Sequence, residues 1–223
     1  MGAKALAVAG NVALHTSGKI AARNGQPTLQ GDRIIEWSFV VARLRDAPAT
    51  TLDFGADTGF VSLAAAQRGH QVVALDRLPD PRDYRQERVE YVQADILDRP
   101  LADRRFDQIV NCSSVEHVGL AGRYGSGTRA DGDLEAMGVL RDLLADGGQM
   151  ILTIPVGRDT VCGSAHRIYG EARLPRLLDG YEVDEAQFWA KNRFWAETDR
   201  DSALATEGSI AFYSLGLFVL SRG

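Results

Sequence analysis

The chain has 223 residues, of which 45% are hydrophobic and 25% are charged. This length predicts one α/β domain with a sizeable core and argues against several domains, and the globular composition excludes a disordered chain. Because 25 Lys and Arg residues face 30 Asp and Glu residues, the net charge is -5, opposite in sign to a nucleic-acid-binding surface.

The first part of the chain divides at about residue 31. Residues 1–31 are Gly-rich and polar without clear periodicity, and we predict an N-terminal arm or lid there, followed by a single domain at 32–223. Residues 32–44 have apolar side chains at helical spacing, which predicts a helix. No secretory signal is expected at the start.

From Thr50 onward, short apolar runs alternate with segments of helical period. This alternation is typical of βαβ units and predicts an α/β fold with a parallel sheet. The predicted strands are 51–54, 71–76, 89–94, 106–112 and 149–154, and the predicted helices are 60–68 and 133–144.

The alternation stops after Pro155. A loop with His166 and Tyr169 is expected there, then a short helix near 173–178. Two apolar, aromatic-rich runs, 181–190 and 210–220, predict a closing antiparallel hairpin.

Two cysteines, Cys112 and Cys162, stand apart without metal-binding spacing. They favour a reduced, cytoplasmic setting. No run is long and apolar enough to span a bilayer. We therefore predict neither a membrane partner nor a nucleic-acid partner, and a homo-oligomer stays open.

A glycine-bearing turn, Gly55-Ala56-Asp57-Thr58-Gly59, joins the first strand of the βαβ unit to its helix. Ligands bind at this place in open α/β sheets. A dinucleotide fingerprint from Gly55 needs further glycines where Asp57 and Phe60 stand. Carboxylates near a pyrophosphate are unfavourable by ~1–4 kcal/mol, so Asp53 and Asp57 favour a cationic ligand.

Four segments at successive strand ends together resemble the class I S-adenosylmethionine-dependent methyltransferases. They are Asp53 to Gly59, Asp76, Gln93-Ala94-Asp95-Ile96 and Ser113-Ser114-Val115-Glu116-His117. The resemblance covers about residues 32–223. It implies a doubly wound, Rossmann-like sheet of seven strands, mostly parallel, with a C-terminal antiparallel hairpin and helices on both faces.

The resemblance also implies a set of cofactor contacts. Asp53, Gly55 and Gly59 match the turn that holds the methionine end of S-adenosylmethionine, Asp76 the acid that binds the ribose hydroxyls, and Asp95 and Ile96 the adenine contacts. Ala56, Asp57, Arg77 and Ser113 complete the predicted cofactor site. Asp57 departs from the family, which usually has a small residue there. The alternative is that these Asp residues only cap helices.

Catalysis and acceptor binding are expected at the ends of the fourth and fifth strands. His117 is the first candidate for a base that takes a proton from a hydroxyl, with Glu116 and His166 as further catalytic candidates. His117 as a structural residue bonded to backbone is the alternative. Tyr124, in the Gly-rich segment 118–133, and Arg167 and Tyr169 are candidate acceptor contacts, the last two alternatively pinning their loop.

A metal is not favoured. In methyltransferases of quinone precursors and of RNA 3' ends, Glu-x-x-Glu-His holds a divalent ion, but Ser113 stands here in place of the first acid. The remaining set of Glu116, His117 and His166 is incomplete. No metal is therefore predicted.

The sequence predicts an enzyme that transfers a methyl group from S-adenosylmethionine, with release of S-adenosylhomocysteine, to a hydroxyl of a small molecule. A wider pattern, including Glu36 to Val40 and His166 to Tyr169, resembles little-studied methyltransferases, some of them similar to enzymes acting on sugars or natural products. An amine acceptor is the less favoured choice. A non-catalytic cofactor-binding or regulatory domain, a nicotinamide-dependent oxidoreductase and a nucleic-acid methyltransferase are the alternatives.

Overall fold

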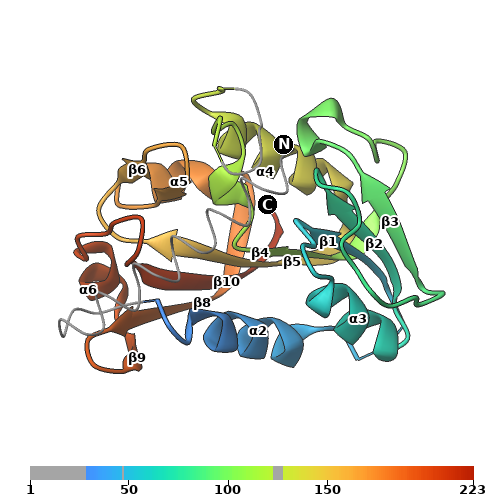
Figure 1. Ribbon diagram of the computed structural model, residues 1–223, viewed down its shortest axis with the longest axis horizontal. Coiled ribbons are helices and arrows are strands. Elements are labelled where there is room, and N and C mark those ends of the chain that lie inside the picture. The colour runs from blue at the N-terminus through green and yellow to red at the C-terminus, as the bar shows by residue number, and fades with distance from the viewer. Residues whose placement is uncertain (1–28, 47, 123–127) are drawn as a thin grey trace.

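The computed structural model describes residues 29–46, 48–122 and 128–223. Its centre is an eight-stranded sheet with helices on both faces, seen edge-on in Figure 1. The predicted α/β, doubly wound fold is confirmed. Of the predicted arm at 1–31, residues 1–28 lie outside the described part of the chain.

The elements follow the predicted order. The helices are α2 (Asp32–Arg43), α3 (Phe60–Gln67), α4 (Gly132–Leu143), α5 (Arg173–Leu177) and α6 (Arg200–Leu204), with short 3₁₀ helices η1 (Ile96–Asp98) and η2 (Val115–His117). The strands of the large sheet are β1 (Thr50–Phe54), β2 (Gln71–Asp76), β3 (Val89–Gln93), β4 (Phe106–Cys112), β5 (Leu144–Val156), β8 (Tyr181–Lys191), β9 (Trp195–Thr198) and β10 (Ser214–Arg222). A separate pair consists of β6 (Thr160–Cys162) and β7 (His166–Ile168).

The strand order of the large sheet is β3-β2-β1-β4-β5-β10-β8-β9. The first five strands are parallel, and β10, β8 and β9 add in antiparallel fashion. The chain winds outward from β1 to β3 and then returns to place β4 on the other side of β1. This reversal opens a crevice at the carboxyl ends of β1 and β4, the place where open α/β sheets bind ligands.

The C-terminal half differs from the sequence prediction in three details. The sheet has eight strands rather than seven, because β9 adds to β8. β8 and β10 are antiparallel neighbours as expected, but β9 and α6 separate them in the chain, so they are not a hairpin. The predicted loop after Pro155 contains the β6–β7 pair, whose three-residue strands are too short to leave a periodic pattern.

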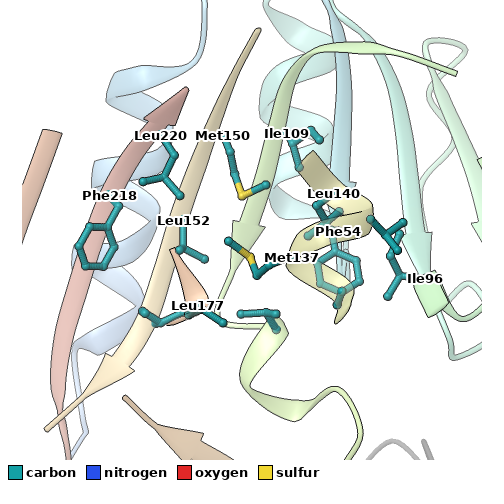
Figure 2. Close-up of a cluster of buried hydrophobic side chains, with 14 of the residues drawn as sticks. Phe54, Ile96, Ile109, Met137, Leu140, Met150, Leu152, Leu177, Phe218 and Leu220 are labelled. Carbon is teal, nitrogen blue, oxygen red and sulfur yellow. The ribbon is translucent and has the colours of Figure 1, made fainter. Parts of the chain in front are cut away.

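The two faces of the sheet are covered by different helices (Figure 1). α2 and α3 pack on one face through a cluster that includes Phe39, Val61 and Leu217. On the other face, α4 packs through Met137 and Leu140. Figure 2 shows side chains of α4, β5 and β10 meeting in this larger cluster. These apolar contacts provide the rigid base on which the strand ends are held.

Both cysteines are free thiols. Burial raises the pKa of the Cys112 thiol, which favours its protonated form. Within the described residues, no helix has the length and apolar character needed to cross a membrane.

Candidate functional site

One cavity lies over the crevice between β1 and β4. Its lining comes from the carboxyl ends of β1, β2 and β4, the segment after β3, and the cavity-facing residues of α2 and α3. Nine of the ten predicted cofactor residues line it: Asp53, Gly55, Ala56, Asp57, Asp76, Arg77, Asp95, Ile96 and Ser113. His117 lines it as well. Gly59, the last residue of the glycine turn, is buried and does not line the cavity. Residues as far apart in the sequence as Asp53 and His117 are thus brought to one place by the parallel strands.

The glycines at either end of the turn after β1 are required by the backbone. Gly55 and Gly59 have φ angles of 74° and 78°, in the left-handed region that glycine adopts without strain. A Cβ at Gly55 would lie 2.1 Å from Ser114 Oγ, and a Cβ at Gly59 would lie 2.4 Å from the Tyr84 hydroxyl. Asp57 is also left-handed, at φ 43°, and is exposed.

Asp53 is the most buried acid of the cavity, with 2% of its surface exposed. Ser62 Oγ donates a hydrogen bond of 2.6 Å to its Oδ2. Burial raises the pKa of Asp53 to about 6, although the hydrogen bonds from Ser62 act in the opposite direction. Burial therefore makes the ionised form of Asp53 less favourable than that of an exposed carboxyl group, and a cation next to it would stabilise that form.

Asp76 and Asp95 extend the acidic wall at the ends of β2 and β3. Asp76 accepts hydrogen bonds from the backbone N–H groups of Asp57, at 3.1 Å, and Leu78, at 2.9 Å. Asp95 caps η1 through the Leu97 N–H and forms an ion pair of 3.1 Å with Arg77. The helix-cap alternative thus describes Asp95 in part, but Asp76 instead braces the glycine turn.

His117 lies in η2, just after β4, and faces the cavity. Its Nδ1 is 2.6 Å from the Ala165 carbonyl oxygen. A carbonyl only accepts hydrogen bonds, so Nδ1 carries a proton and Nε2 is the atom that accepts one in the neutral ring. Nε2 lies 3.7 Å from Glu116 Oε1, where a carboxylate stabilises the ring after protonation. His117 therefore makes the backbone hydrogen bond expected of a structural residue, and it also lines the cavity.

Glu116 and His166 lie next to His117 but do not line the cavity. They are 2% and 7% exposed, and the rings of His117 and His166 are 6.2 Å apart between centroids. Across the described ranges, no group of three His, Cys, Asp or Glu residues is placed to hold a metal ion. Among the described residues, Glu116, His117 and His166 therefore lie near one another without forming a metal-binding group of three.

The predicted acceptor contacts Arg167 and Tyr169 are buried away from the cavity. Arg167 is 1% exposed and donates to the carbonyls of Val118 and Ala130, among others. The Tyr169 hydroxyl donates to Asp133 at 3.1 Å. These bonds favour the alternative in which both residues pin the loop. Tyr124, the third candidate, lies outside the described residues, as do 123–127 of the predicted lid.

Helix α2 contributes residues that the sequence analysis did not assign to the site. Arg33 and Trp37, one helical turn apart, line the cavity, and Trp37 stacks on Phe60 with ring centroids 4.5 Å apart. Glu36 lies beneath them and is 1% exposed. In the sequence, this arrangement is signalled by the position of Glu36, which puts a carboxylate on the apolar side of the predicted helix, between Ile35 and Phe39.

Comparisons with solved structures find the same fold in methyltransferases. The 1,6-didemethyltoxoflavin-N1-methyltransferase of Burkholderia thailandensis, solved with 1,6-didemethyltoxoflavin and S-adenosylhomocysteine, is 19% identical, with 95% of this chain and 88% of that chain covered and a TM-score of 0.57. The N-methyltransferase NodS of Bradyrhizobium japonicum, in complex with S-adenosylhomocysteine, is 16% identical, with 85% and 86% covered and a TM-score of 0.58. A TehB-like SAM-dependent methyltransferase of Corynebacterium glutamicum is 17% identical, with 96% and 99% covered and a TM-score of 0.58.

These likenesses show that the chain has the fold of the class I S-adenosylmethionine-dependent methyltransferases. A search of curated proteins finds no match. The profile of one family matches residues 54–198, more than half of the chain, including the glycine turn and the ends of β2, β3 and β4. The chain therefore belongs to the family described as "Caenorhabditis protein of unknown function, DUF268".

Proposed function

We propose that this protein is an S-adenosylmethionine-dependent methyltransferase that methylates a hydroxyl of a small molecule, such as a sugar or natural product. The observation that carries the proposal is the cavity at the carboxyl ends of β1, β2 and β4, which nine of the ten predicted cofactor residues line. We also propose that it works in the cytoplasm, which its free thiols support.

The charge of the cavity suits the cofactor. Asp53, Asp57, Asp76 and Asp95 line it, and the cofactor is cationic and carries no phosphate. Asp53 attracts the ammonium group, Asp76 accepts from the ribose hydroxyls, and Asp95 and Ile96 face the adenine. The bound cofactor supplies an electrophilic methyl group on a sulfonium. The same acids act against the nicotinamide alternative, since they would repel its pyrophosphate.

His117 is the proposed base. The Ala165 carbonyl holds the proton on Nδ1, so Nε2 accepts the proton of the acceptor hydroxyl as its oxygen becomes the nucleophile. The Glu116 carboxylate, 3.7 Å from Nε2, stabilises the imidazolium that forms. The chain's larger contribution is alignment, because positioning the two reactants supplies ~7–11 kcal/mol.

An amine acceptor is the second candidate. Two of the similar structures are those of proteins named as N-methyltransferases, and an amine that reacts in its neutral form needs a base less. Loss of His117 would then slow transfer to amines much less than transfer to hydroxyls.

Cofactor binding is tested by calorimetry with S-adenosylmethionine and S-adenosylhomocysteine, using Asp76→Ala. We expect binding by the wild type and a loss of affinity of about 10- to 100-fold in the variant, because Asp76 both receives the ribose and braces the glycine turn. Asp98→Asn is the matched control, since Asp98 is exposed and lies outside the cavity lining. Absence of binding to the folded wild type, or equal affinity in Asp76→Ala, would contradict the proposal.

The base is tested by His117→Asn in a radiolabelled methyl-transfer assay over a panel of hydroxyl and amine compounds. The asparagine amide can still donate to the Ala165 carbonyl in place of Nδ1, while the proton acceptor at Nε2 is removed. We expect hydroxyl methylation to fall by about 10²- to 10⁴-fold with little change in cofactor affinity. A wild-type rate would remove His117 as the base, and binding without turnover across the panel would favour a regulatory domain.

A further inference from the structure

Glu36 of α2 holds a buried carboxylate in contact with the ends of two strands. It is 1% exposed and accepts hydrogen bonds from Ser113 Oγ, after β4, and from Thr153 Oγ1 of β5 at 2.8 Å. Arg33, one turn earlier in α2, donates to its other oxygen at 3.0 Å. A buried carboxylate is costly unless it is well paired. These three donors therefore account for its charge and tie α2 to the floor of the cavity.

Ser113, one of the donors, has a strained backbone. Its φ angle is 49°, in the left-handed region that is unfavourable for residues with a side chain. Such a conformation persists only where its surroundings hold it. The Ser113 N–H donates to the Thr153 carbonyl at 2.9 Å, and the side chain is held by Glu36. Both the backbone N–H and the side chain of Ser113 are therefore held by hydrogen bonds.

The turn at Ser113 decides where His117 lies. β4 ends at Cys112, and η2 begins at Val115, so the chain changes direction at Ser113 and Ser114. Ser113 and His117 line the same cavity. On its far side, His117 is anchored by the Ala165 carbonyl. Relaxation of Ser113 to a right-handed conformation would move the start of η2 while that anchor stayed in place, and the His117 ring would turn.

We propose that Glu36 is a positioning residue that keeps Ser113 in the left-handed turn and thereby aims His117 Nε2 into the cavity. The catalytic meaning of this arrangement rests on the proposed function. The hydrogen bond that Ser113 donates to Glu36 spans 77 positions of the sequence, so it couples the helix before the glycine turn to the segment after β4. A role of Glu36 restricted to its ion pair with Arg33 is the competing account.

The two accounts are separated by Glu36→Met, Ser113→Gly and the double variant. Methionine suits a buried helix position and removes both oxygens. Glycine adopts the left-handed conformation without strain, so it no longer needs Glu36. The double variant still lacks Glu36, the ion-pair partner of Arg33, so a recovery in this variant does not depend on that ion pair. Glu185→Met is the matched control, because it breaks an ion pair of the same helix, with Arg43, away from the cavity.

Two readouts are used on the folded full-length chain. Nitrogen-15 spectra of the His117 ring, assigned with His117→Asn, report whether its proton stays on Nδ1. Calorimetry with S-adenosylhomocysteine reports the affinity of the cavity. Loss of 1–2 kcal/mol of support would leave the aligned turn in the minority and weaken binding by about tenfold.

We expect Glu36→Met to mix the two neutral forms of the His117 ring and to weaken S-adenosylhomocysteine binding by about tenfold. Ser113→Gly in that background should restore the Nδ1–H signal, and Glu185→Met should change neither the signal nor the affinity. An unchanged His117 signal in folded Glu36→Met, or no restoration in the double variant, would overturn the proposal. If the wild type binds no S-adenosylhomocysteine, the proposed function fails, whereas the His117 spectra still decide the positioning role.

Discussion

Replacing Asp133 by asparagine is expected to lower the free energy of unfolding by about 3–5 kcal/mol, the cost of breaking a buried ion pair from one side. Asp133 is 0% exposed and accepts from the Tyr169 hydroxyl and from Arg173, whose Nε lies at 2.9 Å. Arg167, 1% exposed, has its Nε 3.5 Å from Asp133 Oδ1. Without the carboxylate, the Arg167 guanidinium would remain buried next to a neutral amide.

Urea unfolding followed by circular dichroism measures this loss. The matched control is Asp142→Asn, on the same helix α4, whose ion pair with Arg99 at 3.2 Å is half exposed on both sides. Exposed pairs contribute about 0–1 kcal/mol. Equal losses in the two variants would show that the buried network does not hold the β7 segment to α4 as described.

Replacing Asp53 by asparagine is expected to stabilise the fold at pH 8 and to abolish tight binding of S-adenosylmethionine. The pKa of Asp53 is raised from 3.8 to about 6 by burial, so the folded protein binds this proton more tightly than the unfolded chain. Its contribution to stability is therefore most favourable below pH 4 and is lost as the pH rises through 6. The shift corresponds to about 3 kcal/mol at most.

Asparagine removes this pH-dependent penalty, and its Oδ1 can still accept from Ser62. Urea unfolding at pH 4 and pH 8 should show a gain of up to about 3 kcal/mol at pH 8 and a much smaller one at pH 4. Asp57→Asn, an exposed residue of the same turn, is the control and should show no such difference. A pH-independent change in Asp53→Asn would contradict the burial of an ionisable group in this place.

The same carboxyl group predicts how cofactor affinity depends on pH. A cationic ligand binds the ionised form of Asp53, so wild-type affinity for S-adenosylmethionine should fall as the pH drops below about 6, by up to tenfold per unit. Asp53→Asn should bind weakly and without this dependence. Wild-type affinity that is flat between pH 5 and pH 8 would contradict the contact between Asp53 and the cation.

Much of the site could be predicted from the sequence because it is local. The turn from Gly55 to Gly59, and the acids Asp76 and Asp95, each follow a strand that its own apolar pattern reveals. In a parallel sheet, the carboxyl ends of successive strands meet at one edge. The alternating pattern was therefore enough to predict the fold class, including antiparallel strands at the C-terminus. Together with the resemblance to the methyltransferases, it identified nine residues that line one cavity.

Pairing between distant segments could not be predicted in the same way. The short strands β6, β7 and β9 have no periodic pattern of their own, and each forms by pairing with a neighbouring strand. Arg167 and Tyr169 have residue types that suit a ligand site, but their partners, Asp133 and backbone carbonyls, place them inside the domain. Polarity alone does not tell a buried, satisfied side chain from one that faces a ligand.

The sequence by itself determined the class of the fold, the acidic glycine turn and the edge of the sheet at which the cavity lies, because backbone preference and strand order act over a few residues at a time. Only the tertiary structure decided that Glu36 lies against Ser113, that the His117 proton is on Nδ1, and that Arg167 is an internal anchor. Each of these depends on a hydrogen bond or ion pair between segments tens of residues apart, whose geometry is set by how the helices pack on the sheet.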